Sequence, residues 1–406
     1  MRERGFFKQC SNLEGLSAKM DEGPVTFYIG IDPTASSAHI GHMIPFFALR
    51  HLVAAGHRGI ALMGGGTARI GDPSFRSETR KILSYEQLDQ NAARILAQLE
   101  RFVGFDGKNT IAANNKDWLA GLNYIDFLRD IGVHFSVNRM LAAEAYKSRM
   151  ETGLSFIEFN YQLLQSYDFL ELYRRHDCRL QIGGDDQWGN ILAGVDLARR
   201  VEGVEVFALT FPLITTADGA KMGKTLKGAL FLDPEITSPY EFFQYWRNVQ
   251  DEDVRRFLLT FTFLPVSEID AICAPGANPN EGKERLAWEI TALIHGAAEA
   301  DRALGGARAA FGGGGDFSAM PSASLKRERF EAGYNAVELF FDAGLASSKS
   351  EARRLFEQGG AFARGADGEL RALADPAAIV GADALDERGE LVLRAGKKRY
   401  CLVTTT

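Results

Sequence analysis

Cysteine is scarce in this chain of 406 residues, and the four that occur are far apart in the sequence: Cys10, Cys178, Cys273 and Cys401. Such spacing excludes a Cys-x-x-Cys zinc pattern and a disulfide framework, so we expect reduced thiols and no structural metal. Long hydrophobic runs are also lacking, since none approaches the roughly 20 residues that span a bilayer. The first residues resemble neither a signal nor a transit peptide. We therefore expect a cytoplasmic location and no membrane partner.

Neither sign of charge dominates, and the chain has no internal repeat. Its 46 Lys and Arg residues against 53 Asp and Glu residues give a formal net charge of −7. Any nucleic acid would therefore be bound by local basic patches rather than by overall attraction, and net charge neither supports nor excludes an RNA partner. The length predicts two or three domains.

The first half of the chain alternates between strand and helix patterns. The predicted order is strand 25–32, helix 40–55, strand 59–63, helix 85–103, helix 124–130, strand 179–183, helix 188–200 and strand 204–209. This alternation is typical of a Rossmann-like α/β fold with a doubly wound parallel sheet. Ligands of such sheets bind beyond the carboxyl ends of the strands.

The second half changes character. Helical patterns without clear strands occupy 239–263 and 282–310, and a glycine-rich break over 311–324 then looks like a flexible linker. Two short helices are predicted beyond it, over 335–345 and 350–358, followed by a small β-rich tail. The expected division is a Rossmann-like catalytic domain, an α-helical domain, a linker and a small α+β domain, with these boundaries: 1–225, 226–312, 313–330 and 331–406.

Two short motifs indicate phosphate chemistry. His39-Ile40-Gly41-His42 places two imidazoles at a helix start, where backbone N–H groups and the helix dipole attract phosphate. Lys221-Met222-Gly223-Lys224-Thr225 adds two ammonium groups and a hydroxyl on a polar loop. Alone, a His-x-x-His pair is commonly a surface or core feature, and a lysine-rich loop is commonly just solvated. Together, in this order and within a strand-helix pattern, they predict an ATP-splitting site.

A P-loop is the competing interpretation of the lysine motif. Gly223-Lys224-Thr225 matches its end, but the earlier glycine that a P-loop needs would fall at Asp218. The following residues, 228–232, do not look like the helix that a P-loop requires. We therefore reject this interpretation.

The segment 155–173 carries apolar residues on every side and is predicted to be a buried helix. Tyr161, Gln165 and Asp168 share one stripe of it. Burying an amide and a carboxylate is unfavourable unless something hydrogen-bonds them, and a small polar ligand would do so. The alternative is that this stripe is the solvent side of an ordinary amphipathic helix.

Other candidate positions lie at strand ends, and each has a structural alternative. Tyr28 would by itself be a core tyrosine, and Asp32-Pro33-Thr34 a turn. The glycine-rich segment 64–72 lets a backbone approach a ligand closely, with Asp72 able to bind an ammonium, but a plain turn is equally consistent with it. The acids in 183–187 can instead cap a helix.

Taken together, these residues resemble the bacterial tyrosyl-tRNA synthetases, a family of class I aminoacyl-tRNA synthetases, over essentially the whole chain. The His-Ile-Gly-His and lysine motifs are class I signatures. The tyrosine-specific context consists of the segments 28–34, 70–74, 161–169 and 181–190.

The resemblance implies a role for each matching residue. It implies a tyrosine site in which Tyr28 and Asp168 bind the phenol. The whole implied site consists of Tyr28, Asp72, Tyr161, Gln165, Asp168 and Gln187. It implies ATP and adenylate contacts from Asp32, Gly30, Gly41, Gly183, Asp186 and Lys224. It implies that the following residues carry out catalysis and bind the leaving pyrophosphate: His39, His42, Thr34, Lys221, Lys224, Thr225, Arg76 and Arg80.

The implied activity is that of a tyrosine-tRNA ligase. L-tyrosine reacts with ATP, supplied as its Mg²⁺ complex, to give tyrosyl-adenylate and pyrophosphate, and the tyrosyl group then passes to the terminal ribose of tRNA(Tyr). No prosthetic group or resident metal is implied, and a homodimer is expected. The segment 331–406 looks like a small RNA-binding module related to a ribosomal small-subunit protein.

Three departures from the family pattern occur, and three other functions compete. Gly223 and Thr225 stand where serines are commoner in class I enzymes, Arg76 stands where lysine is frequent, and 362–365 replaces a Val-Asn-Gly turn. The alternatives are a tryptophanyl-tRNA synthetase, a catalytically silent RNA-binding homologue and a generic adenylate-forming nucleotidyltransferase. Tyr28 with Asp168 favours tyrosine, the intact phosphate motifs favour an active enzyme, and a generic transferase would leave the second half unexplained.

Overall fold

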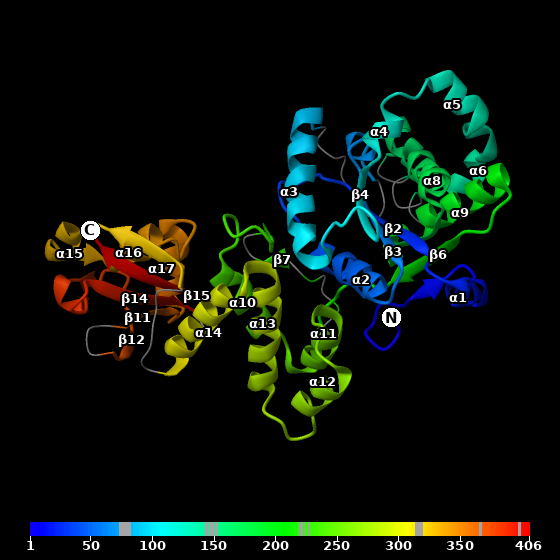
Figure 1. Cartoon of the computed structure of the whole chain (residues 1–406). Helices are drawn as coiled ribbons and strands as arrows, with labels where there is room; N and C mark the ends of the chain where they lie inside the picture. Colours follow the sequence, from blue (N-terminus) through cyan, green and yellow to red (C-terminus); the bar gives the residue numbers. More distant parts are fainter. Residues whose placement is uncertain are drawn as a thin grey trace. The chain divides into compact units, whose positions relative to one another are not determined.

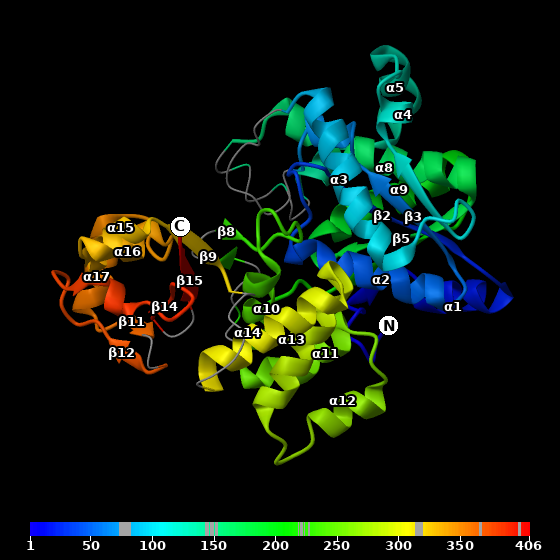
Figure 2. The same cartoon turned by 60° about the vertical axis from the view of Figure 1, so that its left-hand side comes forward.

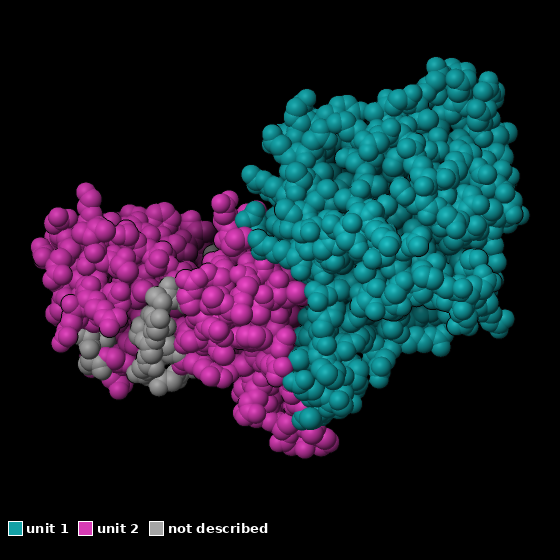
Figure 3. Space-filling view, viewed as in Figure 1, with its two compact units in different colours: residues 1–233, 252–271 teal, residues 234–251, 272–406 magenta. Residues whose placement is uncertain are grey.

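The computed structural model describes residues 1–72, 83–142, 146, 150, 153–217, 219, 222, 224–225, 228–312, 320–364, 368–396 and 399–406, with the backbone only for 224–225, 228 and 309–312. The chain forms two compact units, shown in different colours in Figure 3. The first comprises Met1–Asp233 and Glu252–Ala271, and the second Pro234–Asp251 and Ile272–Thr406. None of the described helices has the length and apolar character that crossing a bilayer requires.

The first unit contains a six-stranded sheet in the order β1-β6-β5-β2-β3-β4. These strands span Gln9–Cys10, Phe207–Phe211, Cys178–Gly184, Thr26–Ile31, Arg58–Met63 and Thr110–Asn114. All neighbours are parallel except β1, which is antiparallel to β6. The chain builds outward from β2 to β4 on one side and from β5 to β6 on the other, so the order reverses between β2 and β5. This confirms the doubly wound sheet, and such a reversal is where ligands of these folds bind.

The first unit also contains helices and short helical turns, most of which connect the strands of the sheet. The longer ones are α1 Leu13–Glu22, α2 Met43–Ala54, α3 Tyr85–Val103, α8 Phe156–His176 and α9 Trp188–Glu202. The shorter ones are α4 Lys116–Leu119, α5 Tyr124–Asp130, α6 Val137–Leu141, α11 Val254–Phe261, α12 Val266–Ile272, η1 Ile40–His42, η2 Thr67–Arg69, η3 Gly132–His134, η4 Asp185–Gln187 and η5 Asp251–Asp253. Helices α8 and α9 run side by side, as both Figures 1 and 2 show.

Local sequence explains several of these boundaries. Helix α3 begins at the capping box of Ser84 and Gln87 and ends before Gly104, whose φ of 63° favours glycine. Helix α8 begins at a second capping box, formed by Ser155 and Glu158. The predicted helices 85–103 and 124–130 are confirmed at both ends.

Other predictions need correction. The helix expected over 40–55 begins with the 3-10 turn η1, and the strand expected over 204–209 begins only at Phe207. Strands β1 and β4 were not predicted, because β1 has two residues and β4 lacks a run of β-branched residues. Helix α8 is not buried along its whole length, since Phe156 is 69% exposed in its first turn.

The second unit combines a helical part with a small mixed sheet. The helices are α10 Pro239–Arg247, α13 Pro279–His295 and α14 Ala297–Gly312. The helical pattern predicted over 282–310 is confirmed, and it is divided between α13 and α14 at Gly296, whose φ is 95°. The sheet has the order β12-β11-β14-β15-β9, with strands Leu370–Ala372, Ala361–Arg364, Glu390–Ala395, Arg399–Thr405 and Ser322–Leu325.

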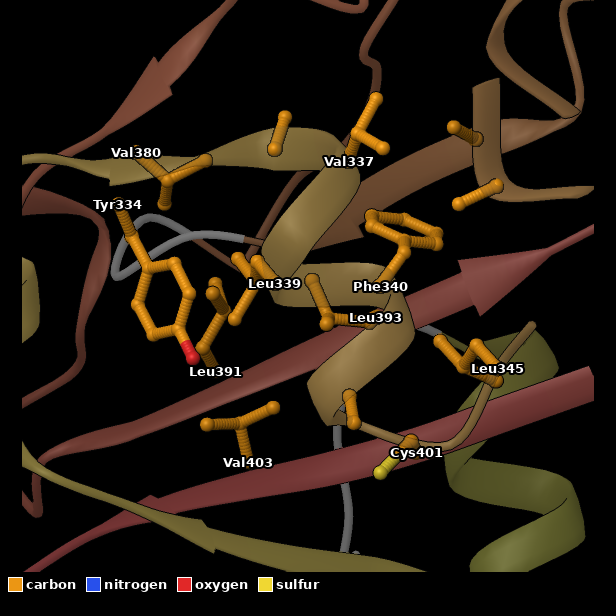
Figure 4. Packing of buried hydrophobic residues seen from close by; sticks show 14 of the residues in the cluster. Tyr334, Val337, Leu339, Phe340, Leu345, Val380, Leu391, Leu393, Cys401 and Val403 are labelled. Atoms are coloured by element: carbon orange, nitrogen blue, oxygen red, sulfur yellow. The ribbon is translucent and has the colours of Figure 1, made fainter. Parts of the chain in front are cut away.

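One face of this sheet is covered by short helices and has its own hydrophobic core (Figure 4). Phe340 from α16 Ala336–Asp342 and Phe356 from α17 Lys349–Glu357 meet in an edge-to-face contact within it. The remaining small elements are α15 Arg327–Glu331, β10 Tyr334–Asn335, β13 Ile379–Val380 and η6 Ala382–Ala384.

The predicted linker 313–330 does not stay irregular to its end. Residues 313–319 lie outside the described part of the chain, but β9 and α15 both fall within 320–331. Strand β9 pairs in parallel with β15, and its Ala323 and Leu325 pack against the core. The folded part of the last module therefore begins before residue 331, because the small residues of β9 pair with the edge strand β15.

Candidate active site

A cavity of about 420 Å³ lies at the carboxyl ends of β2 and β5, where the strand order reverses. Most of the site residues predicted from the sequence line it: Tyr28, Gly30, Asp32, Thr34, His39, Gly41, His42, Asp72, Tyr161, Gln165, Asp168, Gly183, Asp186 and Gln187. The structure thus brings together residues from segments that are far apart in the chain.

The side chains of the remaining predicted residues are not described by the structure. Arg76, Arg80 and Lys221 lie outside the described residues, and only the backbone of Lys224 and Thr225 is described. That backbone forms strand β7 Lys224–Thr225, which pairs antiparallel with β8 Gly228–Ala229. A P-loop would place the start of a helix at this point, so its rejection is confirmed.

The histidine motif has a defined hydrogen-bond pattern. His39 caps η1 and accepts a hydrogen bond at Nδ1 from the Gly41 N–H, at 3.0 Å. The His39 N–H in turn donates to Nδ1 of His42, at 3.2 Å. Because both Nδ1 atoms accept, we infer that a neutral ring carries its proton on Nε2 in each case. Each ring therefore carries an Nε2–H donor, and the two rings line the cavity with their centroids 4.0 Å apart.

The chain that follows the lysine motif returns to the histidine motif. The Ile40 N–H donates to the Leu230 carbonyl at 3.0 Å, and the Leu232 N–H donates to the Ala38 carbonyl at 2.9 Å. His39 and Phe231 form the bridge between these two bonds. The β7–β8 hairpin is therefore anchored beside the two imidazoles, a proximity that the sequence spacing did not show.

At the other end of the cavity, Asp168 is 2% exposed and holds two donors. Asn115 Nδ2 lies 2.8 Å from Oδ2, and Trp118 Nε1 lies 2.7 Å from Oδ1. Burial raises the pKa of Asp168 to about 8, although these two donors lower it; the charges of Asp32 and Glu171 also raise it. The stripe on α8 is thus buried, and the interpretation as a solvent-facing stripe is wrong.

Within the described part of the chain, three buried polar atoms on this cavity have no hydrogen-bond partner: the Tyr28 hydroxyl, Oε1 of Gln165 and Oε1 of Gln181. Such atoms are rare in folded proteins because each forfeits its hydrogen bonds to water. Burial, with the nearby charge of Asp168, also raises the pKa of the Tyr28 hydroxyl well above its usual value, so it remains a neutral donor. A hydroxyl and two amide oxygens can be satisfied by a ligand that carries both a hydroxyl and an ammonium group.

Asp32 joins three elements at the floor of the site. Thr67 Oγ1 donates to Oδ1 at 2.8 Å, and the Tyr161 hydroxyl donates to Oδ2 at 3.1 Å. A side chain at Gly64 could not be accommodated, since its Cβ would lie 2.0 Å from Asp32 Oδ1. The segment 64–72 therefore provides the close approach that the sequence suggested, and it is more than a plain turn.

A second carboxylate lies on the same cavity. Gln187 Nε2 donates to Oδ2 of Asp72 at 2.8 Å, which links η4 to the glycine-rich segment. The neighbouring Asp185 does not cap a helix, because its Oδ1 accepts from Gln9 Nε2 at 2.7 Å and from Thr210 Oγ1 at 2.9 Å. The capping interpretation is thus wrong for Asp185, which ties η4 to β1 and β6.

Sequence reasoning missed four residues of this site: Thr67, Asn115, Trp118 and Gln181. Asn115 also donates to Thr67 Oγ1 at 2.9 Å and accepts from the Gly66 N–H at 2.8 Å. It therefore connects Asp168 with Thr67, which in turn binds Asp32. Its position follows β4, a strand that was not predicted. An asparagine and a tryptophan after an unrecognised strand carry no local signal of a polar site.

The comparisons with known proteins agree with this site. Residues 20–312 match the family described as class I tRNA synthetases (W and Y). The chain is 60% identical to the tyrosine–tRNA ligase of Treponema denticola, over 98% of this chain and 97% of that one. It is 59% identical to the tyrosine–tRNA ligase of Treponema pallidum, over 100% of this chain and 97% of that one.

A solved structure agrees as well. The C-terminally truncated mitochondrial tyrosyl-tRNA synthetase of Aspergillus nidulans matches with a TM-score of 0.68 at 31% identity, over 76% of this chain and 92% of that one. Fold and site thus define a class I tRNA synthetase of the tryptophan and tyrosine type. Within that class, the chain belongs to the tyrosine–tRNA ligases, which confirms the resemblance and sets aside the alternatives of a tryptophan enzyme and of a silent homologue.

Proposed function

We propose that the enzyme activates L-tyrosine with ATP and transfers it to tRNA(Tyr) in the cavity at the ends of β2 and β5. The tyrosine carboxylate attacks the α-phosphate of ATP in line, and pyrophosphate leaves with its Mg²⁺. A terminal ribose hydroxyl of the tRNA then attacks the tyrosyl carbonyl, and AMP leaves. Both steps need alignment and charge stabilisation rather than a protein nucleophile. The observation that carries this proposal is that one cavity joins buried partners for a phenol to a pair of imidazole donors.

The tyrosine end of the proposed site uses the buried polar atoms. Tyr28 and Asp168 bind the phenolic hydroxyl, and Gln165 offers its unpartnered Oε1 to the α-ammonium. The other residues of this end surround the ammonium, the carboxylate and the ribose of the adenylate: Asp32, Asp72, Tyr161, Asp186 and Gln187. Gly30 leaves open space next to this end, since no atom lies within 4 Å of a Cβ built on it.

The phosphate end uses donors from both signature motifs. His39 and His42 donate from Nε2 to phosphate oxygens, and Thr34 adds a hydroxyl. By family resemblance, the lysine loop and two arginines hold the leaving pyrophosphate: Lys221, Lys224, Thr225, Arg76 and Arg80.

Amino-acid-dependent exchange of pyrophosphate into ATP tests this function. Measured with each of the twenty amino acids, the exchange is expected to be far more efficient with tyrosine than with tryptophan or phenylalanine, because only tyrosine satisfies the buried hydroxyl-binding pair. Exchange that prefers tryptophan, or no exchange with any amino acid, would contradict the proposal.

The tRNA is proposed to be bound by the helical part and the last module. We keep the division into 1–225, 226–312, 313–330 and 331–406 as a functional proposal, with the folded module beginning earlier than its nominal start. The module has an independent hydrophobic core and can act as a separate binding element. Since tRNA and ATP are its substrates, we place the enzyme in the cytoplasm.

A homodimer is part of the proposal, and an exposed apolar face is its expected interface. Elements α5, η3, α6 and α8 expose these residues: Tyr124, Ile125, Leu128, Val133, Val137, Phe156 and Ile157. Helices α5, α6 and α8 contribute to one buried cluster, and η3 directly follows α5, so the exposed residues belong to one part of the first unit. Contiguous apolar surface marks interaction sites, and an apolar face is complementary to a copy of itself.

Charges introduced into this face should separate the subunits. In a variant with Ile125→Asp and Val133→Asp, at positions 68% and 71% exposed, each copy would bury two uncompensated carboxylates. We expect the dissociation constant of the dimer to rise at least about a hundredfold, measured by sedimentation equilibrium. Ile379→Asp, at a 63% exposed apolar position in the second unit, is the control and should leave the dimer intact. A double variant that remains dimeric would exclude this interface.

A further inference from the structure

An ion-pair cluster that the proposed mechanism does not use adjoins the tyrosine end of the site. Asp168, Glu171 and Arg175 are spaced so that they share one stripe of α8. Glu171 is buried, and its two oxygens bind two arginines, with Arg174 Nη1 3.1 Å from Oε1 and Arg175 Nε 3.0 Å from Oε2. A buried carboxylate requires such compensation, because its own desolvation is unfavourable.

Arg175 makes a second contact that Arg174 does not make among the described residues. Its guanidinium carbon lies 5.3 Å from the centroid of the Trp118 ring, within the range of a cation–π interaction. The same indole donates from Nε1 to Asp168 Oδ1 at 2.7 Å. Arg175 is therefore linked through Trp118 to Asp168, the carboxylate that is proposed to bind the phenol.

Trp118 needs support from outside its own helix. Helix α4 spans only Lys116–Leu119, too short to be stable alone. The indole packs in a cluster with Tyr28 and Phe169, which restricts its position but supplies no polar contact to orient its N–H. Arg175, held in place through Glu171, supplies a charged plane on the indole.

We propose that Arg175 is a positioning residue of the tyrosine site: held by Glu171, it fixes the Trp118 indole so that the N–H points at Asp168 and thereby raises the affinity for tyrosine. This inference rests on the proposed function, in which Asp168 binds the phenolic hydroxyl. An arginine suits the role because its planar fork can bind a carboxylate along its edge while its face contacts an aromatic ring. A lysine ammonium, as a compact point charge, cannot do both.

The test compares Arg175→Gln with Arg174→Gln in pyrophosphate exchange. We expect Arg175→Gln to raise the KM for tyrosine about tenfold, the size of one partly desolvated cation–π contact, and to leave the KM for ATP within about twofold. Arg174→Gln removes an equal charge from Glu171 without touching Trp118, and it should leave both KM values within about twofold. The fold should survive, since the Arg175 side chain is 48% exposed and Glu171 keeps one arginine.

A double-mutant cycle isolates the action through Trp118. In a Trp118→Phe background, Arg175→Gln should change the KM for tyrosine by less than about twofold, because the N–H that it orients is gone. Should Arg175→Gln not fold, Arg175→Met keeps the apolar stem and takes its place under the same criteria. An unchanged KM for tyrosine, an equal rise in Arg174→Gln or an undiminished effect without the indole N–H would each overturn the inference. Failure of the proposed function would instead appear in the unmodified enzyme, as absent exchange with tyrosine.

Discussion

Asp168→Asn is expected to lower kcat/KM for tyrosine at least about a thousandfold while leaving kcat/KM for phenylalanine nearly unchanged. The substitution keeps the shape of the side chain but leaves one acceptor oxygen facing two fixed donors, Asn115 and Trp118. The substrate hydroxyl then competes for that oxygen or stays unsatisfied in a buried site. Tyrosyl-tRNA synthetases as a family select tyrosine over phenylalanine by a factor of about 10⁵ without an editing step. Pyrophosphate exchange with both amino acids measures the ratio.

The pH dependence of the melting temperature of the same variant tests independently whether Asp168 is a buried carboxyl group. The folded pKa of Asp168, about 8, exceeds its value of roughly 3.9 in an unfolded chain, so the folded state favours the proton. The stability from this protonated group is complete below about pH 4 and is lost as the pH rises toward 8. The melting temperature of Asp168→Asn relative to that of the unmodified enzyme should therefore increase between these values. A constant difference, together with unchanged selectivity, would exclude a buried carboxylate at the phenol site.

His42→Asn is expected to slow adenylate formation by about 10²- to 10³-fold, with the affinity for tyrosine almost unaffected. The asparagine oxygen can still accept from the His39 N–H, which donates to Nδ1 of His42 at 3.2 Å in the structure. The shorter side chain cannot place a donor where Nε2–H reaches the phosphate oxygens. The loss should therefore fall on the transition state rather than on ground-state binding.

The matched variant is His42→Gln, whose longer side chain can present an N–H near the position of Nε2. We expect it to recover at least about a tenth of the lost rate, because one charge-stabilising donor is restored. Single-turnover formation of tyrosyl-adenylate, at saturating ATP, measures both variants. Equal rates for asparagine, glutamine and histidine at this position would remove the donor role.

Much of the fold and the site followed from local sequence. The alternation of period-two and helical patterns predicted a parallel sheet, and the capping residues Ser84 and Gly104 mark the two ends of a helix that was predicted correctly. Some candidate residues, such as Tyr28, Asp32 and Asp72, were found because they lie in or after strands whose carboxyl ends meet at one edge of a parallel sheet, and the family resemblance supplied the roles. The polar stripe on α8 was recognisable because, in a helix that is apolar on all sides, an amide and a carboxylate are costly to bury unless they bind something.

Other features depended on contacts between distant segments. Asn115 and Trp118 follow a strand with no clear pattern, and only the packing of α4 against α8 makes them donors to Asp168. Strand β9 looked like linker because small residues acquire an edge partner only once β15 is in place. The pairing of 230–232 with 38–40 likewise has no local signal.

The chain's own residues thus specify which secondary structures form and which chemical groups are available, since propensity, capping and periodicity act over a few neighbouring residues. Which donor faces which acceptor is settled by long-range packing. Hydrogen-bond geometry depends on tenths of an ångström across elements whose separation in sequence carries no information about their distance in space.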